Sequence, residues 1–111
     1  MTVQMTRIVK TTALVVVALV ASATLARAQS PGSKGRDLLT ANCANCHAVG
    51  RQGASKLPAA VPFRVIAKRY PPANLAEALA EGIVTGHPGM PQFTFTPEEI
   101  GNILTYLESL R

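Results

Sequence analysis

Several features are scarce in this sequence. Its 111 residues include no tryptophan, two cysteines and two histidines, and 5% of them are aromatic. No stretch alternates apolar and polar residues as a half-buried strand does, which excludes a sheet-based fold. The uncharged stretch 11–26 is sixteen residues long, shorter than the roughly twenty that span a bilayer. We therefore expect the regular structure of the chain to be helical. We also expect that the N-terminal apolar run does not serve to span a membrane.

That N-terminal run has the form of an export signal. A basic segment precedes the apolar block 13–21, and residues 26–28 read Ala-Arg-Ala, the small-x-small pattern that signal peptidase cleaves. We expect cleavage after Ala28, which makes 1–28 a signal peptide and 29–111 one domain. An uncleaved membrane anchor is the alternative, and its short length disfavours it.

Removal of the leader changes the charge of the protein. Three of the eleven lysines and arginines lie in 1–28, so the remaining domain carries eight basic and six acidic residues, a net charge of +2. So small a charge gives no reason to expect a nucleic acid partner. Basic residues predominate before residue 70 and acidic ones after it, which fits either solvated faces or a docking patch.

The strongest motif is Cys43-Ala44-Asn45-Cys46-His47. Two cysteines two residues apart and followed at once by histidine are the attachment pattern of a c-type haem. Each thiol can add across one vinyl group of the porphyrin, and the next side chain then reaches the iron. The pattern predicts one covalent haem c held by Cys43 and Cys46, with His47 as an axial iron ligand.

Three other interpretations of these residues compete with haem. A structural zinc site needs four ligands, usually in two pairs, and His47 adjoins Cys46 too closely for an ordinary finger. A thioredoxin-like redox pair needs a βαβ context and a longer chain, and a plain disulfide would leave His47 without a role. Haem attachment explains all three residues at once.

The candidate for the second axial ligand is a methionine. Met90 is the one methionine that remains after the leader is removed, and it lies in the stretch 83–95, which is too rich in glycine and proline for regular structure. A thioether between Gly89 and Pro91 offers the iron a soft ligand on a stiff backbone. We expect Met90 to bind the iron. His87 is the rival ligand, and an open iron position is the third alternative.

The helical pattern predicts about four short helices separated by long loops. The last is the clearest, because Thr96, Pro97 and Glu99 form a capping box with proline at the first position. Its apolar stripe should face the core, and comprises Ile100, Ile103, Leu104, Leu107 and Leu110. Among the earlier helices, we expect Ser33 to cap the first, Pro62 to open the second and Asn74 to cap the third. The second should end at Pro71-Pro72 and the third at Gly82.

Two further roles are assigned to the segment after the motif. Metal-bound histidines usually donate their other ring nitrogen to an acceptor, so we expect a backbone carbonyl of the loop 48–61 to accept from His47. Arg64, Arg69 and Tyr70 are candidates to contact the haem propionates, with surface charge or a core aromatic as the alternative role for each.

The residues now assembled resemble the class I small soluble cytochromes c of bacteria, from about Ser33 to Arg111. The resemblance rests on the haem motif, on Gly89-Met90-Pro91 and on the terminal helix around 103–107. It implies an all-α, cytochrome c-like fold wrapped around one covalent haem, with His47 and Met90 as axial ligands.

The same resemblance implies a close crossing of the first and last helices, with Gly35 and Leu39 against Ile103 and Tyr106. The chain also departs from the family, both in a missing tryptophan and in the loop after His47, which lacks the Gly-x-Pro pattern of larger members. Many relatives have a tryptophan that hydrogen-bonds a propionate, and this chain has none, so Tyr70 is its possible substitute.

The function implied is that of a periplasmic one-electron carrier without catalytic residues, which docks transiently at the haem edge between respiratory or dehydrogenase partners. We expect a monomer with no nucleic acid partner and no stable membrane insertion, and Lys56 and Lys68 could steer an acidic partner. One alternative is a dedicated haem subunit of a periplasmic oxidoreductase complex. Another is an open-site peroxidase or gas binder, with His87 as its distal group.

Overall fold

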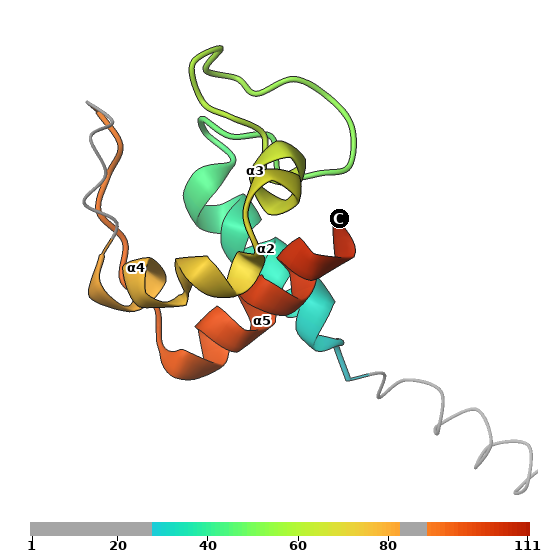
Figure 1. The fold of residues 1–111 in the computed structure, drawn as a ribbon, viewed down its shortest axis with the longest axis vertical. Helices are drawn as coiled ribbons and strands as arrows, with labels where there is room; N and C mark the ends of the chain where they lie inside the picture. The colour runs from blue at the N-terminus through green and yellow to red at the C-terminus, as the bar shows by residue number, and fades with distance from the viewer. Residues whose placement is uncertain (1–27, 83–88) are drawn as a thin grey trace, which may run out of the picture.

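The computed structural model describes residues 28–82 and 89–111. Over these two ranges the chain is helical and contains no β-strand, so the predicted all-α class is confirmed. No helix within them is long and apolar enough to cross a membrane. The elements are four α-helices and one 3-10 helix (Figure 1): α2 (Pro31–Cys43), α3 (Phe63–Arg69), η1 (Pro72–Leu75), α4 (Ala76–Glu81) and α5 (Pro97–Ser109).

Helices α2 and α5 cross at the centre of the molecule (Figure 1), and Gly35 makes the crossing close. A Cβ atom at Gly35 would overlap the Asn102 carbonyl group and lie 2.9 Å from the Ile103 nitrogen. Glycine in a helix interior costs roughly 0.5–1 kcal/mol relative to alanine, and here it permits two backbones to touch. The predicted packing role of Gly35 is confirmed.

The core gathers around this crossing. Leu39 of α2 and Ile103 of α5 are 1% and 0% exposed and belong to the same apolar cluster. The predicted stripe of α5 is buried at four of its five positions, and Leu104 is half-buried at its margin. Helices α3 and α4 close the cluster with Ala67 and Leu79.

The start of α5 and both ends of α3 lie where local sequence signals place them. In α5 the Thr96 side chain accepts from the Glu99 nitrogen at 3.3 Å, and the Glu99 carboxylate accepts from the Thr96 nitrogen at 2.8 Å, so the capping box is present. Pro62 precedes α3 as predicted, and the helix ends where Pro71 follows, because a residue before proline disfavours the helical conformation.

Two predicted helix starts are wrong. The first helix begins at Pro31 with Ser30 as its cap, whose side chain accepts from the Ser33 nitrogen at 3.2 Å. Ser30 and Pro31 together supply both the cap and the favoured first residue, so Ser33 falls inside the helix.

Asn74 does not cap a helix either. It lies within η1, and α4 starts after Leu75 with no side-chain cap. The prolines at 71 and 72 set up a tight turn, in which the Asn74 nitrogen donates to the Pro71 carbonyl at 3.0 Å. The end of α4 is as predicted, because Gly82 follows it with a φ of +91°.

Candidate haem site

The three residues of the motif lie in one turn at the end of α2. The helix ends at Cys43, whose carbonyl oxygen accepts from the Cys46 nitrogen at 3.1 Å and from the His47 nitrogen at 2.9 Å. Both cysteines are half-buried and neither is in a disulfide. The turn therefore places the two cysteines and the histidine at successive positions beside the end of one helix, as the attachment motif of a c-type haem requires.

The Cys43 thiol is a poor candidate for redox catalysis. Its burial, and next the neighbouring Cys46, raise the pKa of Cys43 from 9.0 to about 11. A thioredoxin-like pair works through a thiolate whose pKa is lowered. The pKa of Cys43 is shifted in the opposite direction, so the structure disfavours the redox-pair interpretation.

The zinc interpretation finds no further ligands. Within residues 28–82 and 89–111, no three or more histidine, cysteine, aspartate or glutamate side chains gather as a metal cluster. His87 lies outside the described residues. The motif thus offers a tetrahedral zinc ion too few partners in the part of the chain that is described.

His47 is held in one orientation by a backbone acceptor. Its Nδ1 atom lies 2.7 Å from the carbonyl oxygen of Val61. A carbonyl can only accept, so Nδ1 donates the hydrogen and Nε2 keeps its lone pair for a metal. The expectation of a carbonyl acceptor in the loop 48–61 is confirmed, and Val61 is the last residue of that loop.

Further contacts fix the segment around this imidazole. The Phe63 ring lies 5.3 Å from the His47 ring between centroids, and the Phe63 nitrogen donates to the Ala48 carbonyl at 3.0 Å. The Ala48 nitrogen in turn donates to Ser55 Oγ at 3.0 Å. Sequence analysis did not identify Phe63 or Ser55 as supports. For Phe63 its place directly after Pro62 was a usable signal, whereas Ser55 had none.

One arginine has a buried side-chain nitrogen that lacks a hydrogen-bond partner among the described residues. The Nη1 atom of Arg64 is buried and has no hydrogen-bond partner among the described residues, an arrangement that is costly for a charged donor. A haem carries two propionate carboxylates, and a guanidinium is well suited to pair with one. The residues present therefore fit the group. Arg69 and Tyr70, the other two candidates, are exposed, Tyr70 by 53%.

Met90 comes from a different segment, between α4 and α5. It is half-buried and follows Gly89, which has a φ of +84°. This segment is fastened near its end, where the Phe95 nitrogen donates to the Leu79 carbonyl at 2.9 Å. Gly82 also packs against the Gln92 side chain, with no room for a Cβ between them. Iron ligation by Met90 stays a prediction.

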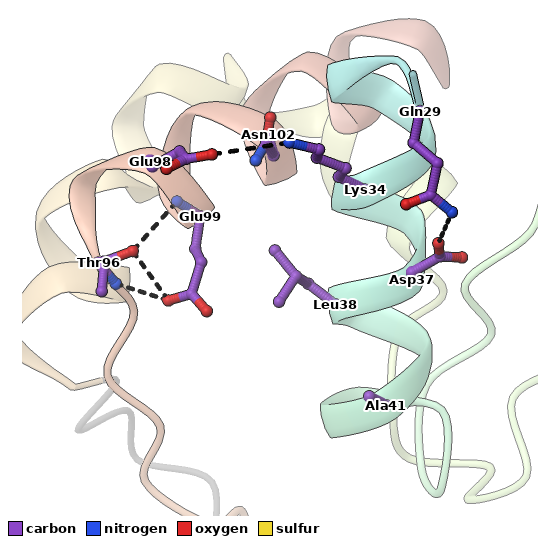
Figure 2. Close-up of a pocket in the computed structure, with 9 residues that line it drawn as sticks. All are labelled: Gln29, Lys34, Asp37, Leu38, Ala41, Thr96, Glu98, Glu99 and Asn102. Atoms are coloured by element: carbon purple, nitrogen blue, oxygen red, sulfur yellow. Dashed lines mark hydrogen bonds and ion pairs between the residues drawn. The ribbon is translucent and has the colours of Figure 1, made fainter. Parts of the chain in front are cut away.

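A shallow groove between α2 and the start of α5 is separate from these residues. Figure 2 shows Leu38 and Ala41 on one wall, with the Thr96 and Glu99 capping box on the other. Lys34 and Glu98 bridge the groove at 3.7 Å. None of Cys43, Cys46, His47 and Met90 lines it, so the groove is not the predicted haem site.

A helical fold closed by a glycine-mediated helix crossing, with paired thiols and an oriented imidazole in one turn, defines a small c-type cytochrome. Residues 30–107 match the family described as cytochrome c oxidase, cbb3-type, subunit III, and the chain belongs to this family. It is also 38% identical to cytochrome c-552 of Bradyrhizobium diazoefficiens over 97 residues, which are 86% of this chain and 89% of that one. No solved structure matches it.

These similarities establish the cofactor and the general activity. The protein has a cytochrome c-like fold, carries covalently bound haem c and is a haem electron carrier. Proteins of this class pass electrons to protein partners. The predicted resemblance to small bacterial cytochromes c is confirmed.

Proposed function

We propose that this chain is an exported, periplasmic one-electron carrier in which Cys43 and Cys46 hold the haem while His47 and Met90 bind its iron. The observation that carries the proposal is the hydrogen bond from His47 Nδ1 to Val61, because it leaves the Nε2 lone pair free for a metal. It is an electron-transfer protein and not an enzyme.

When bound, the haem supplies the single-electron step by cycling between Fe(III) and Fe(II). The protein's own residues hold and tune it. Val61 keeps the His47 tautomer and orientation, and the soft Met90 sulfur favours the reduced iron and raises the potential. The buried Nη1 atom of Arg64 pairs with a propionate, which gives this charged donor an acceptor.

Export follows from the leader at 1–28, with cleavage after Ala28. The basic start, apolar block and small-x-small end support it, as does the attachment of such haems outside the bacterial cytoplasm. A retained membrane anchor is the rival outcome, and the N-terminal sequence of the purified protein distinguishes the two.

Partner docking takes place at the haem edge. Lys56 in the loop after the motif and Lys68 on α3 are both exposed, and exposed positive charge accelerates encounter with an acidic surface more than it adds affinity. With a net charge of +2 on 29–111, we expect association to be transient and moderately salt-sensitive, and the free protein to be a monomer.

A dedicated oxidase subunit is the second candidate, because the family description names such a subunit. A permanent interface would present a contiguous apolar patch. The large hydrophobic side chains exposed in the described residues are Leu57 and Tyr70. The relative named cytochrome c-552 is also aligned over 89% of its own length, so it is a protein of similar size. A freely diffusing carrier is favoured.

The test is an absorption spectrum of the mature protein, oxidised and reduced, with and without carbon monoxide. Sharp low-spin bands, a weak sulfur-to-iron(III) charge-transfer band and no response to carbon monoxide support the carrier. High-spin features with rapid carbon monoxide binding would instead indicate an open-site peroxidase or gas binder. Gel filtration of the periplasmic extract separates a free monomer from a subunit that elutes with a larger complex.

A further inference from the structure

The chain just after the haem motif is attached to the last helix by a partly buried hydrogen bond. Val49 lies two residues beyond His47, and its carbonyl oxygen accepts from Tyr106 Oη at 2.9 Å. Val49 is 8% exposed and Tyr106 is half-buried. Because water has only partial access to compete, this bond constrains the backbone more than a fully exposed one would.

Three consecutive residues are each bonded to a different part of the protein. His47 donates from Nδ1 to Val61, Ala48 bonds to other residues through both its nitrogen and its carbonyl, and Val49 accepts from Tyr106 on α5. A displacement of Val49 therefore reaches His47 through a single intervening residue.

A second contact ties the same loop to the same helix. An Nη2 hydrogen of Arg51 is donated to the carbonyl of Ser109, in the last turn of α5. Tyr106 and Ser109 are three residues apart, so they lie on neighbouring positions of one helix face. A cation at a helix C-terminus is favourable by itself, and together the two contacts hold 49–51 against α5.

We propose that Tyr106 is a positioning residue for the axial histidine: its hydroxyl, acting through Val49, joins the Val61 acceptor in setting the orientation of the His47 imidazole. The inference rests on the proposed iron ligation by His47. It gives the last helix a role beyond core packing, because α5 then helps to orient a ligand that lies in the motif turn.

The test is Tyr106→Phe in the haem-loaded protein, which keeps the ring and removes the hydroxyl. Two NMR readouts report on the imidazole: the pattern of haem methyl shifts in the oxidised protein, which follows the ligand plane, and the exchange of the His47 Nδ1 hydrogen with solvent. We expect an altered methyl pattern and about fivefold faster exchange, the size expected for loss of one neutral hydrogen bond.

The same helix offers a control in Thr105→Val. The exposed Thr105 hydroxyl donates to the Gly101 carbonyl within α5 at 2.8 Å, and its removal should leave both readouts as in the unmodified protein. If Tyr106→Phe also leaves the methyl pattern and the exchange rate unchanged, the positioning role is overturned, whatever happens to overall stability.

Failure of the proposed function is recognised separately. Hyperfine-shifted ring signals of His47 in the unmodified protein establish that it binds iron, and their absence would refute the ligation before Tyr106 is considered. If the Tyr106→Phe protein cannot be obtained with haem bound, the inference is tested on the unmodified protein instead. Its Tyr106 hydroxyl hydrogen should exchange slowly and show an Overhauser effect to Val49, and exchange as fast as that of Tyr70 would overturn the inference.

Discussion

The Nδ1 atom of His47 lies 2.7 Å from the carbonyl oxygen of Val61, fourteen residues further along the chain. This bond selects the tautomer in which Nε2 is unprotonated, so the imidazole is prepared for a metal before one arrives. The loop between the two residues therefore has a defined task, which is to return an acceptor to the histidine. The predictions below test the site and the helix crossing that supports it.

Replacement of Met90 tests the second axial ligand. Met90→Ala should keep the haem covalently attached and open the iron to carbon monoxide, because alanine supplies no donor atom. Absorption spectra of the reduced protein with and without carbon monoxide measure this. Thr94→Ala, an exposed position in the same segment, is the control and should stay unresponsive. A Met90→Ala protein that remains low-spin and does not bind carbon monoxide would show that Met90 is not an iron ligand.

Replacement of the cysteines tests the attachment. With Cys43 and Cys46 both changed to alanine, any bound haem should be extractable by acidified organic solvent, because no thioether remains. The single variant Cys46→Ala should retain its haem through one bond. Haem that stays with the double variant after extraction would show that these thiols are not the tethers.

Arg64 should contribute to the stability of the haem-loaded protein. Arg64→Leu removes the partner of a propionate, and we expect the free energy of unfolding to fall by about 1–3 kcal/mol and the reduction potential to fall as well, since a positive charge near the iron disfavours Fe(III). Chemical denaturation and potentiometry measure the two quantities.

Arg69→Leu is the matched control for Arg64, because Arg69 lies on the same helix and is exposed. Little change in either quantity is expected there. An Arg64→Leu protein with an unchanged potential and undiminished stability would mean that the guanidinium serves no propionate.

The helix crossing predicts a large effect of one added methyl group. Gly35→Ala puts a Cβ into the Asn102 backbone, and overpacking of this kind costs about 1–3 kcal/mol. Denaturant unfolding of the holoprotein should show that loss. Gly101→Ala is the control, because a Cβ there meets no atom within 4 Å, and the change should raise stability by about 0.5–1 kcal/mol. Equal effects at the two glycines would contradict a close crossing.

Much of the fold was predictable because its signals are local. The capping box of Thr96 and Glu99 and the apolar stripe that follows it are complete within fifteen residues. Where two local signals compete, the prediction failed. Ser33 was expected as the first cap, yet Ser30 directly precedes Pro31 and takes that role. Asn74 was expected to cap α4, and the paired prolines before it impose a 3-10 turn instead.

The site was predictable to a similar extent and for the same reason. The motif at 43–47 is contiguous, so its chemistry could be inferred directly, and the need of His47 for a carbonyl acceptor followed from general coordination chemistry. Among three candidate propionate partners, however, nothing local distinguished Arg64 from Arg69. They are five residues apart on one short helix, but the Nη1 atom of Arg64 is buried whereas Arg69 is exposed.

By itself, the sequence determined the helical class, the haem motif, the candidate ligands and the boundaries set by glycine and proline, because each depends on residues that are neighbours in the chain. The tertiary structure alone decided that Val61 is the acceptor, that the Nη1 atom of Arg64 is buried without a hydrogen-bond partner among the described residues, and that Tyr106 reaches Val49 from 57 residues away. Those features depend on which surfaces are excluded from water when distant segments pack, and no local pattern encodes that.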